Sequence, residues 1–99
     1  MALENTFKTK LCKEIKERFP GAMIFHLDPN EMQGAPDLLV LYEDKWAALE
    51  GKKNAKASHR PNQDYYVDAM NKMSFARFIY PENKEEVLNE LQRSFKACR

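Results

Sequence analysis

Residues 36–52 read Pro-Asp-Leu-Leu-Val-Leu-Tyr-Glu-Asp-Lys-Trp-Ala-Ala-Leu-Glu-Gly-Lys, and this stretch decides the fold. After its aspartate the segment 37–42 is apolar, which is typical of a strand that is buried on both faces. The polar triplet 43–45 predicts a hairpin turn, and residues 46–52 predict the returning strand. The sequence therefore predicts two antiparallel strands that are joined by a short turn.

The same stretch carries Asp37, Glu50 and Lys52. Side chains at i and i+2 of a strand share one face, so Glu50 and Lys52 project together, and the hairpin brings Asp37 beside them. Carboxylates bind Mg²⁺ or Mn²⁺, and a nearby cation orients or activates water during phosphodiester hydrolysis. Two alternatives stay open from the residues alone. In the first alternative, Asp37 is only a turn residue at the start of a strand. In the second, Glu50 forms an ion pair with Lys52 or Lys53 on an exposed face of the sheet.

Apolar periodicity and turn residues place the remaining elements. Apolar residues recur every four positions in 4–18, which predicts an amphipathic helix. Pro61 suits the first turn of a second helix, and Asn83 with Glu86 predicts a capping box for a third. The elements expected around the hairpin are a helix over 4–18, a strand over 22–27, a helix over 61–73, a strand over 75–80 and a final helix with the stripe Val87, Leu88, Leu91 and Phe95. The order αβββαβα predicts an α/β fold with helices on both faces of a small mixed sheet.

Length and composition limit the class of protein. The 99 residues suit a single domain over 1–99, and 43% hydrophobic with 31% charged residues is ordinary for a globular protein. No apolar stretch approaches a membrane span or a signal peptide, so cytoplasmic residence in a bacterial or phage-infected cell is expected. Cys12 and Cys98 are too few for a disulfide framework or a zinc site.

Three short motifs occur in a characteristic order: Gly34-x-Pro36-Asp37-Leu38, then Glu50-x-Lys52, then Pro61-x-Gln63. In this the chain resembles the PD-(D/E)XK nuclease superfamily, and most closely its VRR-NUC branch, which includes stand-alone phage and bacterial proteins of similar length. The resemblance covers essentially the whole chain. It implies a restriction-endonuclease-like core, a Mg²⁺ or Mn²⁺ cofactor and DNA as the substrate. Gly51 departs from the bulky apolar residue that is usual between the acid and the lysine.

The resemblance and the charges together assign roles to the site residues. Asp37 and Glu50 are the expected metal ligands, the resemblance adds the Gly51 carbonyl, and Lys52 positions water or stabilises charge on the phosphorane. Glu4 on the first helix is a further expected metal ligand, with Glu14 as a weaker competitor, and a plain first-turn glutamate is the alternative for Glu4. Gln63 is expected to orient the water, Lys52 or a phosphate. Tyr66, one turn further on, either supports Gln63 or packs in the core.

Charge is distributed unevenly although the net charge is only +1. The loop after the second hairpin strand is basic and precedes a helix N-terminus, so Lys53, Lys56 and Arg60 are expected to contact DNA phosphates. His59 is a further candidate contact, whereas His26 is expected near the mouth of the site but not as a ligand. A solvated flexible loop is the alternative for this segment.

The function expected from these features is a divalent-metal-dependent DNA endonuclease. The resemblance further implies a homodimer that cuts branched DNA such as four-way Holliday junctions, since two sites in a two-fold dimer can each address one strand. The interface is expected at residues 75–80 and at Leu88, Leu91 and Phe95. The alternatives are a catalytically weak or inactive DNA-binding module, and a nuclease subunit of a larger phage replication or recombination complex.

Overall fold

A computed structural model describes residues 2–28 and 31–96 of the protein, and the side chains from Thr6 onward. In this part the elements are α1 (Ala2–Arg18), β1 (Met23–His26), β2 (Leu38–Tyr42), β3 (Lys45–Gly51), α2 (Pro61–Met73), β4 (Phe75–Ile79) and α3 (Lys84–Lys96). The predicted α/β order αβββαβα is therefore confirmed, and each boundary lies within about two residues of its expected place. Among the described residues, no helix is both long and apolar enough to cross a membrane.

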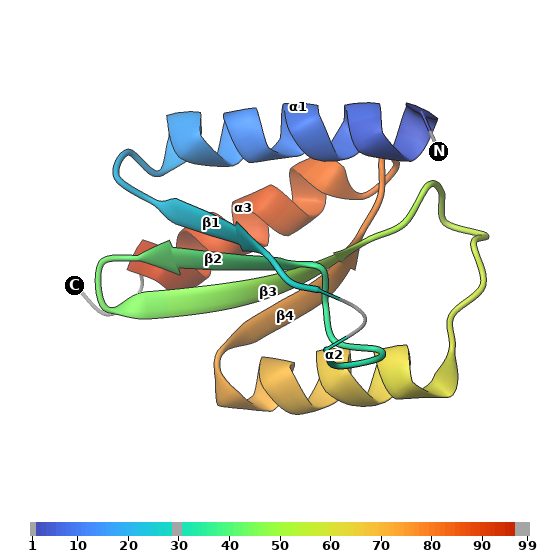
Figure 1. Ribbon diagram of the computed structural model, residues 1–99. Helices are drawn as coiled ribbons and strands as arrows, with labels where there is room; N and C mark the ends of the chain where they lie inside the picture. The colour runs from blue at the N-terminus through green and yellow to red at the C-terminus, as the bar shows by residue number, and fades with distance from the viewer. Residues whose placement is uncertain (1, 29–30, 97–99) are drawn as a thin grey trace.

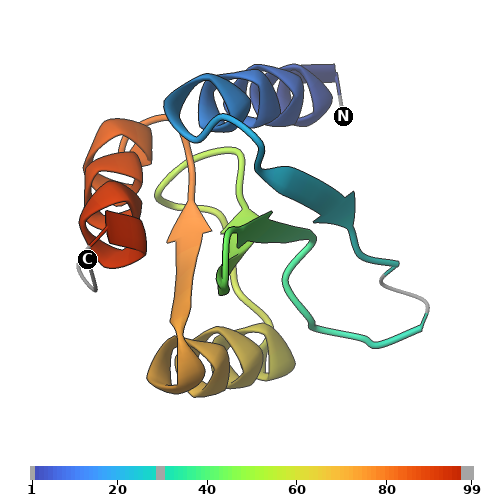
Figure 2. The same cartoon turned by 90° about the vertical axis from the view of Figure 1, so that its left-hand side faces the viewer.

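The strands form one mixed sheet in the order β1-β2-β3-β4. β1, β2 and β3 pair antiparallel, and β4 pairs parallel with β3 after the crossover through α2. Helices α1 and α3 lie on one face of the sheet, and α2 lies on the other (Figure 1). Figure 2 shows the same layers after a quarter turn, with β1 at the free edge on the side away from α3.

The main core fills the space between the sheet and the α1–α3 layer. Its fully buried side chains come from both helices and from the three longer strands; they include Leu11, Ile15, Phe19, Leu38, Val40, Leu49, Ile79, Leu88, Leu91 and Phe95. The rings of Phe19, Tyr42 and Phe95 pack with centroids 5.1–5.5 Å apart. A smaller cluster of Ala48, Val67 and Ala76 joins α2 to β3 and β4.

The prediction that β2 is buried on both faces is wrong in part. Leu38 and Val40 face the main core, but Leu39 and Leu41 on the other face are only half-buried. The reason is that α2 packs on β3 and β4 and leaves the β1–β2 end of this face without a helix. Met23 and Phe25 of β1, which pair with Leu41 and Leu39, are 56% and 45% exposed.

Two further predictions for the C-terminal part are wrong. The Asn83 side chain does not cap α3: its Oδ1 accepts the Tyr80 N–H and its Nδ2 donates to the Phe78 carbonyl, which closes the turn before the helix. The stripe expected at a dimer interface is also part of the core, since Leu88, Leu91 and Phe95 are at most 1% exposed. An amphipathic stripe shows that a face is buried but does not show against what.

Candidate active site

Asp37 is held at the start of β2 by three contacts. Its carbonyl accepts the Leu27 N–H at 2.9 Å, and its Oδ1 accepts the Gly51 N–H at 3.1 Å. The loop that leads to it packs on the first turn of α2 through Gly34, whose φ is +89°. A Cβ on Gly34 would lie 2.5 Å from the Asn62 side chain, so both the backbone angle and the lack of space require glycine there. Oδ2 of Asp37 pairs with Lys8 at 2.5 Å.

Glu50 lies on β3 next to Asp37. Leu38 pairs with Leu49 across the antiparallel ladder, so Asp37 and Glu50 occupy the next positions and share a face of the sheet. Glu50 is only 7% exposed. Burial, and then the negative charge of Asp37, raise the pKa of Glu50 to about 7, against the opposing effects of Lys52 and Lys8. Among the described residues Glu50 forms no ion pair with Lys52 or Lys53, and it does not lie on an exposed face.

Gln63 connects Glu50 to Lys52. Its Oε1 accepts the Lys52 ammonium at 2.8 Å and the Arg60 backbone N–H at 3.0 Å. Those two donors fix the orientation of the amide, so its Nε2 donates to Glu50 Oε2 at 3.1 Å. Lys52 also donates to the Ser58 carbonyl at 3.1 Å, and its backbone N–H continues the β3–β4 ladder to Ile79. A neutral amide thus holds both charged groups on the α2 face of the sheet.

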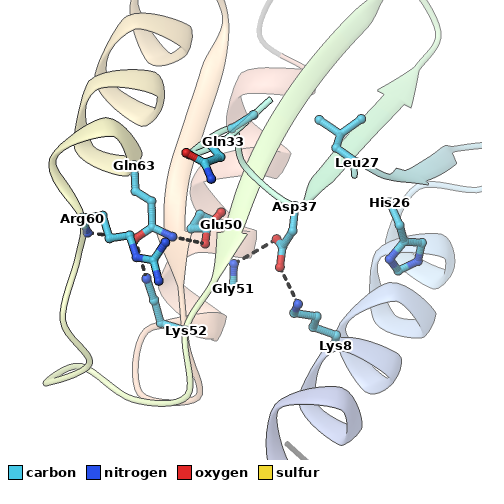
Figure 3. A pocket seen from close by; sticks show the side chains of 12 residues that line it. Lys8, His26, Leu27, Gln33, Asp37, Glu50, Gly51, Lys52, Arg60 and Gln63 are labelled. Atoms are coloured by element: carbon cyan, nitrogen blue, oxygen red, sulfur yellow. Dashed lines mark hydrogen bonds and ion pairs between the residues drawn. The ribbon is translucent and has the colours of Figure 1, made fainter. Parts of the chain in front are cut away.

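These residues line one cleft of about 510 Å³ between the sheet, α2 and the N-terminal half of α1. Figure 3 shows Gln63, Arg60 and Lys52 on one side of Glu50, and Asp37 with Lys8 on the other. The described residues that line it are Lys8, His26, Leu27, Gln33, Gly34, Ala35, Asp37, Glu50, Gly51, Lys52, Arg60 and Gln63. Lys8 and Gln33 were missed by the sequence analysis. His26 lies at the rim, as expected for a residue near the mouth.

The predicted phosphate contacts separate into two groups. Arg60 lines the cleft, whereas Lys53 and Lys56 are exposed on the loop between β3 and α2 and lie outside the cleft lining. His59 stacks on Phe78 with ring centroids 3.9 Å apart and contacts Asp64 at 3.0 Å. Of these predicted contacts, two exposed lysines therefore lie beside the cleft, and Arg60 lines it together with Lys52.

The two acids of α1 that were candidates for the site have different outcomes. The side chain of Glu4, a predicted metal ligand, lies outside the described residues. Glu14 does not line the cleft; it bonds to Lys84 at 2.7 Å, and that hydrogen bond is the main reason why its pKa is lowered. Tyr66 also lies outside the cleft lining and packs edge-to-face on Tyr65. A supporting role for Glu14 or Tyr66 at the cleft is not consistent with these positions.

The donor set fits a hard divalent cation. Asp37 and Glu50 present carboxylates on adjacent strands, and the burial and mutual repulsion that raise the pKa of Glu50 would both be offset by a cation between them. The Gly51 N–H points to Asp37, and because the N–H and C=O of one strand residue lie on the same edge, its carbonyl faces the same side. Among the described residues no third His, Cys, Asp or Glu joins them. Mg²⁺ is commonly held by one or two carboxylates, with water completing the shell.

The protein has a restriction-endonuclease-like α/β fold, and its cleft holds Asp37, Glu50 and Lys52 at the ends of adjacent strands. The chain is similar to a solved structure described as a VRR_NUC domain, with a TM-score of 0.61, 24% sequence identity, and coverage of 82% of this chain and 92% of that one. No protein-family model and no curated protein matches the sequence. The protein therefore has the VRR_NUC fold, as its motifs indicated.

Proposed function

We propose that the protein is a divalent-metal-dependent DNA endonuclease and that Asp37, Glu50 and Lys52 form its active site. The observation that carries this proposal is their convergence in one cleft, with Gln63 bonded to both Glu50 and Lys52. Such a constellation suits hydrolysis of a phosphodiester better than binding alone, since a buried carboxylate beside a second carboxylate is unfavourable without a catalytic or metal-binding purpose.

Asp37 and Glu50, with the Gly51 carbonyl, would hold Mg²⁺ or Mn²⁺. The bound cation would polarise the scissile phosphate and lower the pKa of the attacking water. The Lys52 ammonium, held by Gln63 and by the Ser58 carbonyl, would stabilise the charge that develops on the phosphoryl oxygens. Arg60 in the cleft would fix the DNA backbone.

Exposed Lys53 and Lys56 would add phosphate contacts along the duplex. These are backbone contacts, so they favour recognition of DNA shape over base sequence. We include branched DNA, such as a four-way junction, and a homodimeric state in this proposal. The exposed Met23 and Phe25 at the free sheet edge are better candidates for self-association than the buried stripe of α3.

Cleavage of labelled four-way junctions and linear duplexes, with Mg²⁺, Mn²⁺ or EDTA, tests the proposal. Wild type should cut only with a metal, and Asp37→Asn should not cut while still binding DNA. The matched control is Asp68→Asn, which removes an exposed acid of α2 that pairs with Lys72 outside the cleft. Metal-independent cutting, or equal cutting by the Asp37 variant, would refute the assignment. DNA binding without any cutting would instead favour a binding module. Equal cutting of both substrates by a sedimenting monomer would remove only the junction and dimer part.

A further inference from the structure

Lys8 reaches the candidate metal site from the opposite side of the sheet. It lies on α1, which covers the sheet face away from α2, yet its Nζ is 2.5 Å from Asp37 Oδ2. About three-quarters of each side chain is buried, with 25% of Lys8 and 23% of Asp37 exposed. The contact therefore lies inside the cleft lining and is not an ordinary ion pair of the surface (Figure 3).

Gly51 provides the space through which Lys8 passes. A Cβ at residue 51 would lie 3.2 Å from Lys8 Cε and 3.7 Å from Lys8 Cγ. The backbone does not require glycine there, because the glycines with positive φ are Gly21 and Gly34. A side chain at residue 51 would therefore crowd Lys8, so the glycine leaves Lys8 the room to reach Asp37, and the two residues form one structural unit.

The carboxylate of Asp37 is held by this unit at both oxygens. The Gly51 N–H bonds to Oδ1 and the Lys8 ammonium bonds to Oδ2. A divalent cation that binds Asp37 must compete with the ammonium, since two positive charges a few ångströms apart repel each other strongly in a partly buried site. The Lys8 side chain is flexible, but its backbone is anchored in α1. An ammonium that a cation displaces from Asp37 therefore stays in the cleft, where a DNA phosphate would be its natural partner.

We propose that Lys8 is a positioning residue of the cleft. In the metal-free protein Lys8 holds Asp37 and thereby weakens binding of the divalent cation. When the cation binds, the Lys8 side chain moves away from Asp37 and its ammonium pairs with a DNA phosphate. This inference rests on the proposed function, because it concerns the same metal and the same substrate. It assigns to Gly51 a second purpose besides its carbonyl, namely the passage for Lys8.

Titration of the full-length protein with Mn²⁺ by calorimetry, without DNA, tests the inference apart from activity. Lys8→Gln should tighten Mn²⁺ binding roughly fivefold, the factor that corresponds to loss of one partly exposed ion pair. Gly51→Ala keeps the lysine but pushes it aside, so it should shift affinity in the same direction by less. The double variant should bind no more tightly than Lys8→Gln alone. Lys13→Gln, an exposed lysine of the same helix, is the control of equal charge and should change nothing.

A single-turnover cleavage assay at saturating Mn²⁺ provides the second readout. Lys8→Gln should cut more slowly than Lys13→Gln although it binds the metal more tightly, because its phosphate contact is lost. Equal Mn²⁺ affinity for wild type and Lys8→Gln would overturn the inference and leave the nuclease proposal intact. Absence of Mn²⁺ binding in wild type and in Lys8→Gln would overturn both. Mn²⁺ binding by the Lys8→Gln variant but not by wild type would give the inference its strongest support.

Discussion

Replacement of Glu50 by glutamine should stabilise the metal-free protein, and the gain should depend on pH. The pKa of this carboxyl rises from 4.5 to about 7 on folding, first through burial and then through the charge of Asp37. The folded protein therefore holds the Glu50 proton more tightly than the unfolded chain does. Raising the pH through this window ionises a group that the fold prefers to keep neutral, so stability falls between pH 4.5 and about 7.

The size of the effect follows from the same pKa. One pKa unit corresponds to about 1.4 kcal/mol, so the rise costs the folded wild type roughly 3 kcal/mol once Glu50 is fully ionised. The glutamine side chain has nearly the same shape as that of Glu50 and keeps an oxygen for the Gln63 amide. At about pH 8.5 the Glu50→Gln variant should therefore be more stable by up to roughly 3 kcal/mol, and near pH 4 the two proteins should be about equal.

Urea unfolding in EDTA, followed by the fluorescence of Trp46 over a series of pH values, measures this difference. Trp46 is the single tryptophan and is half-buried on β3. Glu14→Gln is a matched control of opposite sign. The Lys84 hydrogen bond lowers the pKa of Glu14, so that variant should be less stable than wild type at neutral pH, with the loss shrinking in acid. A Glu50→Gln difference that is constant across the pH series would refute the reasoning.

Three other substitutions probe the cleft, the basic loop and the core. Lys52→Ala should reduce the rate of cleavage by orders of magnitude, and exposed Lys53→Ala should reduce it much less; equal losses in a single-turnover assay would contradict the position of Lys52 beside Gln63. Lys56→Ala should weaken DNA binding alike for all sequences and lower the salt slope by roughly one counterion in a fluorescence titration, and dependence on base sequence would contradict backbone recognition. Leu91→Ala should cost roughly 2–5 kcal/mol in urea unfolding without changing the sedimenting mass, whereas a lower mass at full stability would return this residue to an interface.

Most of the fold could be predicted because each element has a local signal. The alternation of period two and the hairpin turn predicted that Asp37 lies beside Glu50, but the exact register was not predicted. The observed turn is shorter than the expected triplet 43–45, because Lys45 pairs with Tyr42 and Leu38 therefore pairs with Leu49. Pro61 at the first helical position placed Gln63 in the first turn of α2, where its side chain reaches back to the Arg60 N–H. The proximity of Asp37, Glu50 and Gln63 thus follows from strand and helix periodicities that are visible in the sequence.

The remaining features depend on how the helices and strands pack against one another, and hydrophobic periodicity along the sequence does not specify that packing. The stripe of α3 was correctly identified as apolar, but only the packing of α3 against Phe19 and Tyr42 shows that it faces the core of its own chain. The amide of Asn83 could cap α3 or close the preceding turn. It closes the turn because the Tyr80 N–H and the Phe78 carbonyl together satisfy both of its polar groups.

The contact of Lys8 with Asp37 also could not be predicted from periodicity, yet the sequence does contain a trace of this contact. The contact with Asp37 depends on where α1 crosses the end of β3, and periodicity places Lys8 only on a partly exposed helix face. The trace is Gly51, a residue without a side chain between Glu50 and Lys52, in a strand where glycine weakens pairing. Its backbone angle gives no reason for glycine, whereas a Cβ there would lie 3.2 Å from Lys8 Cε and would crowd the lysine that pairs with Asp37. A departure from an expected motif is thus most informative where the local backbone does not explain it.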